Sequence, residues 1–236
     1  MVLYGLQKLS LLDYPGKLAA TLFTGGCGLR CPFCHNASLV THLADASPLS
    51  EQEVLDFLER RRGKLEGVCI TGGEPLMQPD LGDFIKKIRE KGFLVKLDTN
   101  GCHPRELSGI LDAGLVDYVA MDVKNSFEKY PETVGIPGFD VGPVFESLRL
   151  LLNGATPFEF RTTLVKPFHT AEDMHSIGRA VRGAERYFLQ SFEDSGDLIG
   201  YPRCAEGAPL KAFTARETEG FRDILSEYVK TVTIRN

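Results

Sequence analysis

The sequence predicts an α/β protein with a parallel sheet, folded as a single domain. Short apolar runs alternate with segments of helical periodicity from Leu18 onward, and this alternation is typical of parallel strands joined by right-handed helical crossovers. No low-complexity linker and no change in composition divides the 236 residues. Hydrophobic residues make up 43% of the chain and charged residues 25%, as in ordinary globular proteins.

Strands and helices are expected in regular order along the chain. A strand pair around the turn Asp13–Gly16 fills residues 1–18, the core fills 19–190, and a loop with a last helix and strand fills 191–236. Apolar runs place the strands at 18–24, 67–71, 93–97, 117–122, 158–165, 186–190 and 230–235. After a first helix that Ser50 opens, helical periodicity places the others at 80–92, 104–114, 144–152, 171–181 and 214–229.

The first helices carry recognisable boundary residues. Ser50 and Glu53 fit a capping box, in which each side chain accepts a hydrogen bond from the other residue's amide. Asp80 fits the N-cap of the next helix, and Gly92 fits the left-handed position after its last turn. Pro104 fits the first turn of the helix that follows.

The charge balance and hydropathy exclude several classes of function. The chain has 27 Lys and Arg against 32 Asp and Glu, a net charge of −5, which gives no attraction to nucleic acid or to anionic membranes. No apolar run approaches the roughly 18–20 residues of a membrane span. The start at Met1 lacks the basic stretch and apolar core of a signal peptide. We therefore expect a cytoplasmic protein that binds neither nucleic acid nor a membrane.

Polar and glycine-rich motifs directly follow four of the expected strands. In parallel α/β proteins, ligands and catalytic groups collect at the carboxyl ends of the strands. We therefore expect the four motifs to converge on one site. They are Gly25-Gly26-Cys27, Thr71-Gly72-Gly73-Glu74, Asp98-Thr99-Asn100-Gly101 and Asp122-Val123-Lys124.

The six cysteines are the most informative residues for chemistry. Cys27, Cys31 and Cys34 lie within eight residues, and in a cytosolic chain such a group favours metal binding over disulfides. Three thiolates without a fourth nearby suit a four-iron cluster that leaves one iron open to an outside ligand. A zinc site completed by a distant Cys or His is the alternative. The remaining cysteines are expected to be bystanders: Cys69, Cys102 and Cys204.

These motifs carry a family resemblance. The pattern Cys27-x3-Cys31-x2-Cys34, with an aromatic residue before the third cysteine, resembles the radical S-adenosylmethionine (SAM) enzymes. The segment Thr71–Pro75 is similar to the second motif of that superfamily. Two segments match the subgroup that activates glycyl-radical enzymes: Asp98–Gly101 and Met121–Lys124. Three more are similar to activating proteins of anaerobic ribonucleoside-triphosphate reductase: Leu9–Gly16, Phe23–Cys27 and Cys31–Asn36.

The resemblance implies a fold, a cofactor and a reaction. The fold is a partial (β/α)6 TIM-like barrel in one radical SAM domain over residues 1–236. Cys27, Cys31 and Cys34 would be the catalytic centre and hold one [4Fe-4S] cluster, whose open iron binds S-adenosylmethionine. The reduced cluster would split the S–C5′ bond, and the 5′-deoxyadenosyl radical would take a hydrogen atom from a glycine of a partner enzyme. No further cysteine lies before Thr71, where longer relatives carry extra clusters, so one cluster is expected.

Further residues match positions that contact S-adenosylmethionine in the family. The segment Gly72-Gly73-Glu74 would meet the methionine amino group, or would simply form a strand-to-helix turn. Lys124 and Arg161 are suited to the methionine carboxylate, with a surface ion pair as the alternative for Arg161. Where formate-lyase activases carry a His that contacts S-adenosylmethionine, this sequence has Phe192.

The remaining matches concern the adenosine half of the ligand. Phe33 and His35 resemble the pair that flanks the adenine, since an aromatic face suits a planar base. Asp98, Thr99 and Asp122 resemble a ribose site that also holds a monovalent cation near Asp98 and Asp122. Capping of the strand ends is the alternative for both aspartates.

The resemblance also implies partners. A glycyl-radical enzyme is the expected substrate, anaerobic ribonucleotide reductase before others, with a flavodoxin- or ferredoxin-type protein as electron donor. One alternative is activation of a pyruvate formate-lyase type of enzyme, and another is a radical SAM enzyme acting on a small molecule. A zinc- or cluster-binding module without catalysis is a third, but it leaves the Gly-Gly-Glu motif without a role.

Overall fold

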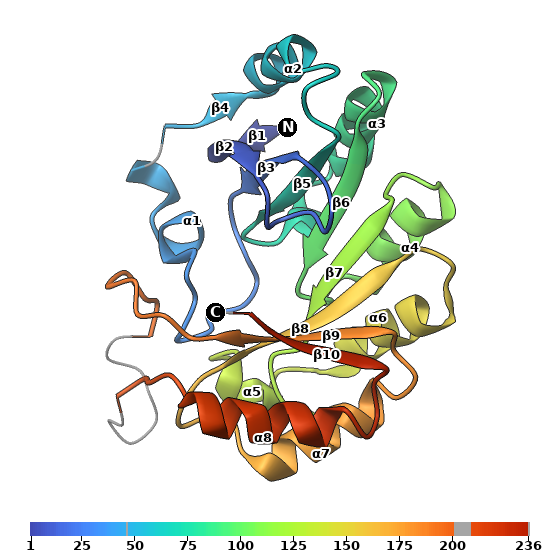
Figure 1. The fold of residues 1–236 in the computed structure, drawn as a ribbon. Helices are drawn as coiled ribbons and strands as arrows, with labels where there is room; N and C mark the ends of the chain where they lie inside the picture. The colour runs from blue at the N-terminus through green and yellow to red at the C-terminus, as the bar shows by residue number, and fades with distance from the viewer. Residues whose placement is uncertain (46, 201–208, 236) are drawn as a thin grey trace. The chain divides into compact units, whose positions relative to one another are not determined.

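The computed structural model describes residues 1–45, 47–200 and 209–235, which form two compact units (Figure 1). Unit 1 comprises Met1–Gly28, Ser38–Thr99 and His103–Ala120, and unit 2 comprises Leu29–Ala37, Asn100–Cys102 and Met121–Asn236. Helix α1 (Ala37–Thr41) and strand β7 (Tyr118–Asp122) run across the division. Organisation of the chain as a single domain stays a prediction.

Unit 1 is built on a mixed sheet. Strand β2 (Gly5–Ser10) runs antiparallel to β3 (Ala19–Thr24), which pairs in parallel with β5 (Gly67–Gly72), and β5 pairs in parallel with β6 (Leu94–Thr99). A two-stranded antiparallel pair joins β1 (Val2–Leu3) to β4 (Leu49–Ser50). The helical elements of this unit are η1 (Leu43–Asp45), α2 (Glu51–Arg60), η2 (Pro75–Met77), α3 (Leu81–Glu90) and α4 (Pro104–Asp112).

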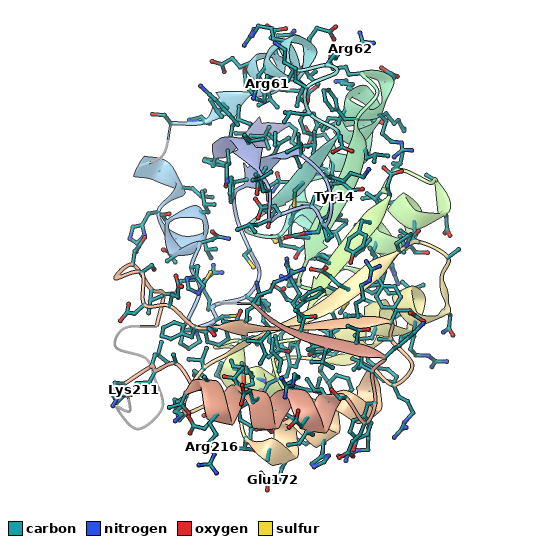
Figure 2. The ribbon with its side chains drawn as sticks, in the orientation of Figure 1. Tyr14, Arg61, Arg62, Glu172, Lys211 and Arg216 are labelled. Atoms are coloured by element: carbon teal, nitrogen blue, oxygen red, sulfur yellow. The ribbon has the colours of Figure 1, made fainter. Side chains whose placement is uncertain are left out.

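The turn after β2 packs an aromatic residue into unit 1. Tyr14 is buried and lies against Tyr118, with ring centroids 6.2 Å apart, and against Ala19 (Figure 2). The prediction of a strand pair within residues 1–18 is therefore wrong in its second strand: β2 lies in that segment, but its partner is β3 at Ala19–Thr24, because the residues between them form a turn that folds onto the sheet.

Unit 2 continues with parallel strands. Strand β8 (Phe158–Leu164) pairs with β9 (Arg186–Ser191), and β9 pairs with β10 (Thr231–Arg235). The amide of Val123, just after β7, donates to the carbonyl of Arg161 on β8 (2.8 Å). Helices α7 (Ala171–Ala180) and α8 (Ala215–Leu225) lie side by side (Figure 1). The helical elements are η3 (Phe127–Lys129), α5 (Tyr130–Thr133), α6 (Gly142–Asn153), α7 (Ala171–Ala180) and α8 (Ala215–Leu225).

The predicted α/β class with a mostly parallel sheet is confirmed, and one predicted cap is wrong in its detail. The capping box of Ser50 and Glu53 is present, and Gly92 has a positive φ of 90°. Asp80 precedes α3 but makes no side-chain bond to the helix, because its carboxylate pairs with the ammonium group of Met1 (2.7 Å). The last helix ends at Leu225, earlier than expected. In the described part of the chain no helix combines the length and apolar character that crossing a bilayer requires.

Candidate functional site

The predicted site residues fall into two groups, one in each unit. The unit 1 group contains Cys27, Gly72, Gly73, Glu74, Asp98 and Thr99. The unit 2 group contains Cys31, Phe33, Cys34, His35, Asp122, Lys124 and Arg161. Each unit brings together residues from several strand ends, and the convergence of the two groups on one site stays a prediction.

In unit 1 the segment after β5 crosses the segment after β3 at contact distance. The amide of Gly73 donates to the carbonyl of Thr24 (2.9 Å), and the amide of Glu74 donates to the carbonyl of Gly26 (2.8 Å). A Cβ atom on Gly73 would overlap the Gly26 backbone, and Gly72 adopts a φ of +114°, which side chains rarely allow. The crossing therefore requires glycine at both positions, and it holds the backbone that leads into the first cysteine.

Glu74 is a fully buried carboxylate that joins two strand ends. Its Oε1 atom accepts a hydrogen bond from the amide of Leu76 (3.1 Å), which caps η2, and another from the hydroxyl of Thr99 (2.8 Å) at the end of β6. Buried carboxylates are stable only where such donors surround them. Glu74 therefore anchors the turn that follows β5 to the end of β6.

Asp98 lies in a buried polar cluster rather than at an open strand end. Its carboxylate forms an ion pair with the ammonium group of Lys96, whose side chain is only 2% exposed. The thiol of Cys69 lies 3.6 Å from Asp98 Oδ1. Cys69 is buried inside β5, as expected for a core residue.

In unit 2 the loop that carries Cys31 and Cys34, called the cysteine loop, is anchored by neighbouring backbone. Cys31 is buried and Cys34 partly exposed, and the amide of Cys34 donates to the carbonyl of Cys31 (3.1 Å). The amide of Arg30 donates to the carbonyl of Val134 (2.9 Å) in the segment after α5. A Cβ atom at Gly135, where φ is +69°, would overlap the Arg30 carbonyl, so glycine permits this approach.

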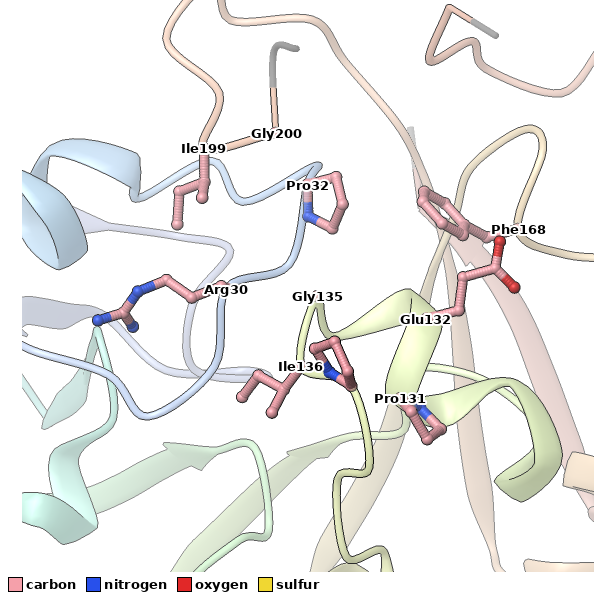
Figure 3. A pocket seen from close by; sticks show the side chains of 10 residues that line it. Arg30, Pro32, Pro131, Glu132, Gly135, Ile136, Phe168, Ile199 and Gly200 are labelled. Carbon is pink, nitrogen blue, oxygen red and sulfur yellow. The ribbon is translucent and has the colours of Figure 1, made fainter. Parts of the chain in front are cut away.

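A pocket of about 550 Å³ lies beside this loop (Figure 3). The amide of Gly200 donates to the carbonyl of Pro32 (3.0 Å) at its rim. None of the predicted site residues is among those that line it within the described chain. The lining residues are Arg30, Pro32, Pro131, Glu132, Gly135, Ile136, Pro137, Phe168, Ile199 and Gly200.

Lys124 and Arg161, which were expected to bind the carboxylate of the ligand, both pair with the carboxylate of Asp122. Asp122, at the end of β7, accepts from Arg161 Nε through Oδ1 (2.8 Å) and from Lys124 Nζ through Oδ2 (2.9 Å). Burial would raise the pKa of Asp122, but the charges of Arg161 and Lys124 outweigh it and hold that pKa well below its usual value. The trio therefore carries one net positive charge.

That positive charge acts on the cysteine loop. Burial would lower the pKa of Lys124, but the charges of Asp122, Cys31 and Cys34 raise it, so the ammonium stays charged. Burial raises the pKa of the Cys34 thiol, while the Asn36 backbone and the charge of Lys124 oppose the rise. A cation beside the loop favours thiolates, the form that binds metal.

The aromatic pair expected to flank an adenine is packed against other rings of unit 2. Phe33 lies against Phe168, with centroids 5.8 Å apart, and His35 lies against Phe192 at 5.9 Å. Burial lowers the pKa of His35, which favours the neutral imidazole. Phe192 thus packs against His35.

Sequence reasoning missed two residues that hold the Lys124 backbone in place. His169 is buried, and its Nε2 lies 2.8 Å from the Lys124 carbonyl while Nδ1 accepts from the amide of Val165 (3.1 Å). Asn125 donates to the carbonyl of Phe168 (2.9 Å). Both bonds span more than forty residues, and no local pattern marks either side chain.

Binding of an iron–sulfur cluster by the three cysteines stays a prediction. In the described ranges, no three His, Cys, Asp or Glu side chains gather as ligands of one ion. A [4Fe-4S] cluster makes a different demand, since each cysteine binds its own iron. Within unit 2, Cys31 and Cys34 lie near the cation of Lys124, and Cys27 begins the same short sequence motif in unit 1. Cys204 lies outside the described residues.

Comparison with known proteins gives consistent matches. The family model for the Radical SAM superfamily matches residues 21–179 of this chain. A protein of Methanocaldococcus jannaschii, provisionally named a glycyl-radical enzyme activating enzyme, is 32% identical over 98% of this chain and 94% of its own length. The pyruvate formate-lyase-activating enzyme of Clostridium pasteurianum is 33% identical over 52% of each chain, so this chain spans about half of that relative.

A solved structure gives the same fold at low identity. SuiB of Streptococcus suis, solved with its precursor peptide SuiA, has a TM-score of 0.70 and 13% identity, over 92% of this chain and 48% of SuiB. Together with the family match, this likeness confirms the fold class predicted from the resemblance, a partial (β/α)6 TIM-like barrel.

Proposed function

The chain belongs to the radical SAM superfamily, within the subgroup that activates glycyl-radical enzymes, and we propose that its partner is an anaerobic ribonucleoside-triphosphate reductase. The observation that carries this choice is the run of residues from Leu9 to Asn36. Its turn, its Gly-Gly-Cys segment and its cysteine loop all resemble activating proteins of that reductase.

The family uses a [4Fe-4S] cluster and S-adenosylmethionine. When bound and reduced, the cluster would supply one electron to the sulfonium of S-adenosylmethionine, so that the S–C5′ bond breaks into methionine and a 5′-deoxyadenosyl radical, which takes a hydrogen atom from a glycine Cα of the partner. We propose that Cys27, Cys31 and Cys34 hold the cluster. The protein's part is to position the ligand and to exclude water and oxygen.

The unit 1 group is suited to the amino group of the methionine moiety. Gly72 and Gly73 carry no side chains, so backbone carbonyls and a ligand can approach closely. Glu74 places a negative charge beside them, with Oε1 fixed by Leu76 and Thr99. An ammonium group is the natural counterpart of a buried carboxylate.

The unit 2 group is suited to the carboxylate and to the adenine. The one net positive charge of Asp122, Lys124 and Arg161 remains to attract an anion. Phe33 and His35 offer ring faces on the same loop as Cys34. We propose Asp98 and Thr99 as the contacts to the ribose.

Electrons must reach the cluster from another protein. A flavodoxin- or ferredoxin-type donor in the cytoplasm is the one we propose, because clusters of low potential are reduced by carriers of this kind.

Radical formation on two partners tests the proposal. The reconstituted, reduced chain is mixed with S-adenosylmethionine and either an anaerobic ribonucleoside-triphosphate reductase or a pyruvate formate-lyase, and glycyl radicals are recorded by electron paramagnetic resonance. We expect the radical on the reductase, and no signal with Cys31→Ala. No radical on the reductase would overturn the proposed partner.

Pyruvate formate-lyase is the second candidate partner, because its activating enzyme in Clostridium pasteurianum shares 33% identity over half of this chain. A radical formed only on the lyase would assign this partner and leave the chemistry unchanged.

A further inference from the structure

Lys96 is a buried lysine inside the sheet of unit 1. Its side chain is 2% exposed and its Nζ forms an ion pair with Asp98, two residues further along β6. Residues two apart on a strand point to the same face, so the ammonium and the carboxylate meet without distortion of the strand. A buried lysine is stable only with such a counter-charge.

Neighbouring strands close the cluster around Lys96. Cys69 stands opposite Lys96 in the register of β5 and β6, and its Sγ lies 3.8 Å from Nζ. Thr21 stands opposite Cys69 in the register of β3 and β5, and its hydroxyl donates to Asp13 (2.5 Å). Within unit 1 the ammonium therefore lies beside Asp98 and Cys69, and its side chain is buried.

The residues expected to hold a monovalent cation do not fit an exchangeable ion. A monovalent cation at a protein site neutralises carboxylates that have no cationic side chain beside them. Asp98 already has the ammonium of Lys96, and in unit 2 Asp122 has both Lys124 and Arg161. A further cation at either carboxylate would be repelled by charges within hydrogen-bond distance.

We propose that Lys96 is the resident counter-ion of Asp98 and takes the place of a bound monovalent cation. A tethered ammonium carries the same charge as potassium and is always present at its site. It follows that S-adenosylmethionine binding does not require potassium or sodium, a consequence that rests on the proposed function. The pairing itself does not depend on that function.

Direct ion binding tests the pairing. Equilibrium dialysis of the reconstituted protein against radioactive rubidium, a potassium substitute, measures bound ions per chain. We expect no stoichiometric rubidium in the wild type or in Lys86→Met, a control at an exposed lysine. Lys96→Met should bind about one ion per chain, and adding Asp98→Asn to that variant should abolish it.

Two results would overturn the proposal: a stoichiometric rubidium in the wild type that Asp98→Asn removes, or none in folded Lys96→Met. If Lys96→Met does not fold, rubidium binding by the wild type and by Asp98→Asn still tests the proposal. Rubidium bound by the wild type and lost in Asp98→Asn contradicts the proposal, and none bound by either supports it.

Ligand affinity in different salts separates this proposal from the proposed function. Dissociation constants for S-adenosylmethionine are measured in potassium, sodium and choline chloride. We expect wild-type affinity to stay the same within about twofold, and Lys96→Met to lose about tenfold or more in choline alone. A tenfold loss by the wild type in choline would contradict the proposal. If S-adenosylmethionine binds in none of the salts, the proposed function is contradicted. The rubidium measurement still tests whether Lys96 is the counter-ion of Asp98.

Discussion

Glu74 is the residue on which the unit 1 group depends most. It is fully buried, and one of its oxygens anchors both the turn η2 and Thr99 at the end of β6. A buried charge held this firmly is already positioned for a ligand, so binding does not have to order it. Because of these contacts, a substitution of Glu74 changes both the charge at the site and the anchoring of η2.

Replacement of Glu74 by glutamine removes the charge and keeps the shape. We expect Glu74→Gln to weaken S-adenosylmethionine binding by about 10–100-fold, measured by equilibrium dialysis on cluster-loaded protein. Thr99→Val keeps the charge but removes both one hydrogen bond to the carboxylate and a proposed ribose contact. Unchanged affinity in Glu74→Gln would contradict the role of the charge.

His169 gives the second prediction at the residue scale, through pH. Burial lowers the pKa of this histidine below its ordinary value of 6.5, despite opposing bonds to the Lys124 and Val165 backbone. The unfolded chain therefore takes up a proton before the folded chain does as pH falls below about 6.5. The contribution of His169 to the free energy of unfolding is full above that pH and decreases below it.

Denaturant unfolding at pH 7.5 and pH 5.5 checks this sign. We expect the wild type to lose more stability between the two pH values than His169→Asn does. His42→Asn, at an exposed histidine, should match the wild type. An identical pH dependence in wild type and His169→Asn would refute the assignment.

At the scale of elements, the ends of β3 and β5 form the crossing on which the cysteine segment rests. Register pairs Thr24 with Gly72, and the two chains then continue in contact through Gly26 and Gly73. Parallel strands place their carboxyl ends at one edge, but the sequence alone does not reveal that two backbones touch there. Glycine is the only residue without a Cβ to separate them.

Gly73→Ala tests the crossing. The added methyl would overlap the Gly26 backbone, and we expect a loss of about 1–3 kcal/mol in the free energy of unfolding, with a lower iron content after reconstitution. Gly109→Ala in α4 is the matched control, because nothing lies within 4 Å of the added Cβ. Full iron content and unchanged stability in Gly73→Ala would contradict the account of the crossing.

At the scale of the whole molecule, the periodic elements were predictable and the long-range contacts were not. The strands from 18–24 to 230–235 appear close to their expected positions because alternation of apolar residues is a local property. The short pair β1 and β4 joins residues almost fifty apart, and no local pattern predicts it. Asp80 shows the same limit, since the distant ammonium of Met1 takes the carboxylate that its own helix would use.

The same distinction between local patterns and long-range contacts holds for the site residues. The spacing of the three cysteines predicted a metal site and the family resemblance added the Gly-Gly-Glu segment, because both motifs are local in the sequence. The ion pair at Asp98 was not predicted, and for Arg161 a surface ion pair was only the alternative, since the partner in each pair is supplied by the fold.

Cleavage of S-adenosylmethionine is the measurement that tests the central claim most directly. Anaerobically reconstituted protein is reduced, its iron is counted, and methionine and 5′-deoxyadenosine are quantified by chromatography. We predict about four irons per chain and equal amounts of the two products for the wild type, with neither the full cluster nor the products for Cys31→Ala. A wild-type chain that holds zinc instead of iron, or that holds an intact cluster and yields no 5′-deoxyadenosine, would contradict it.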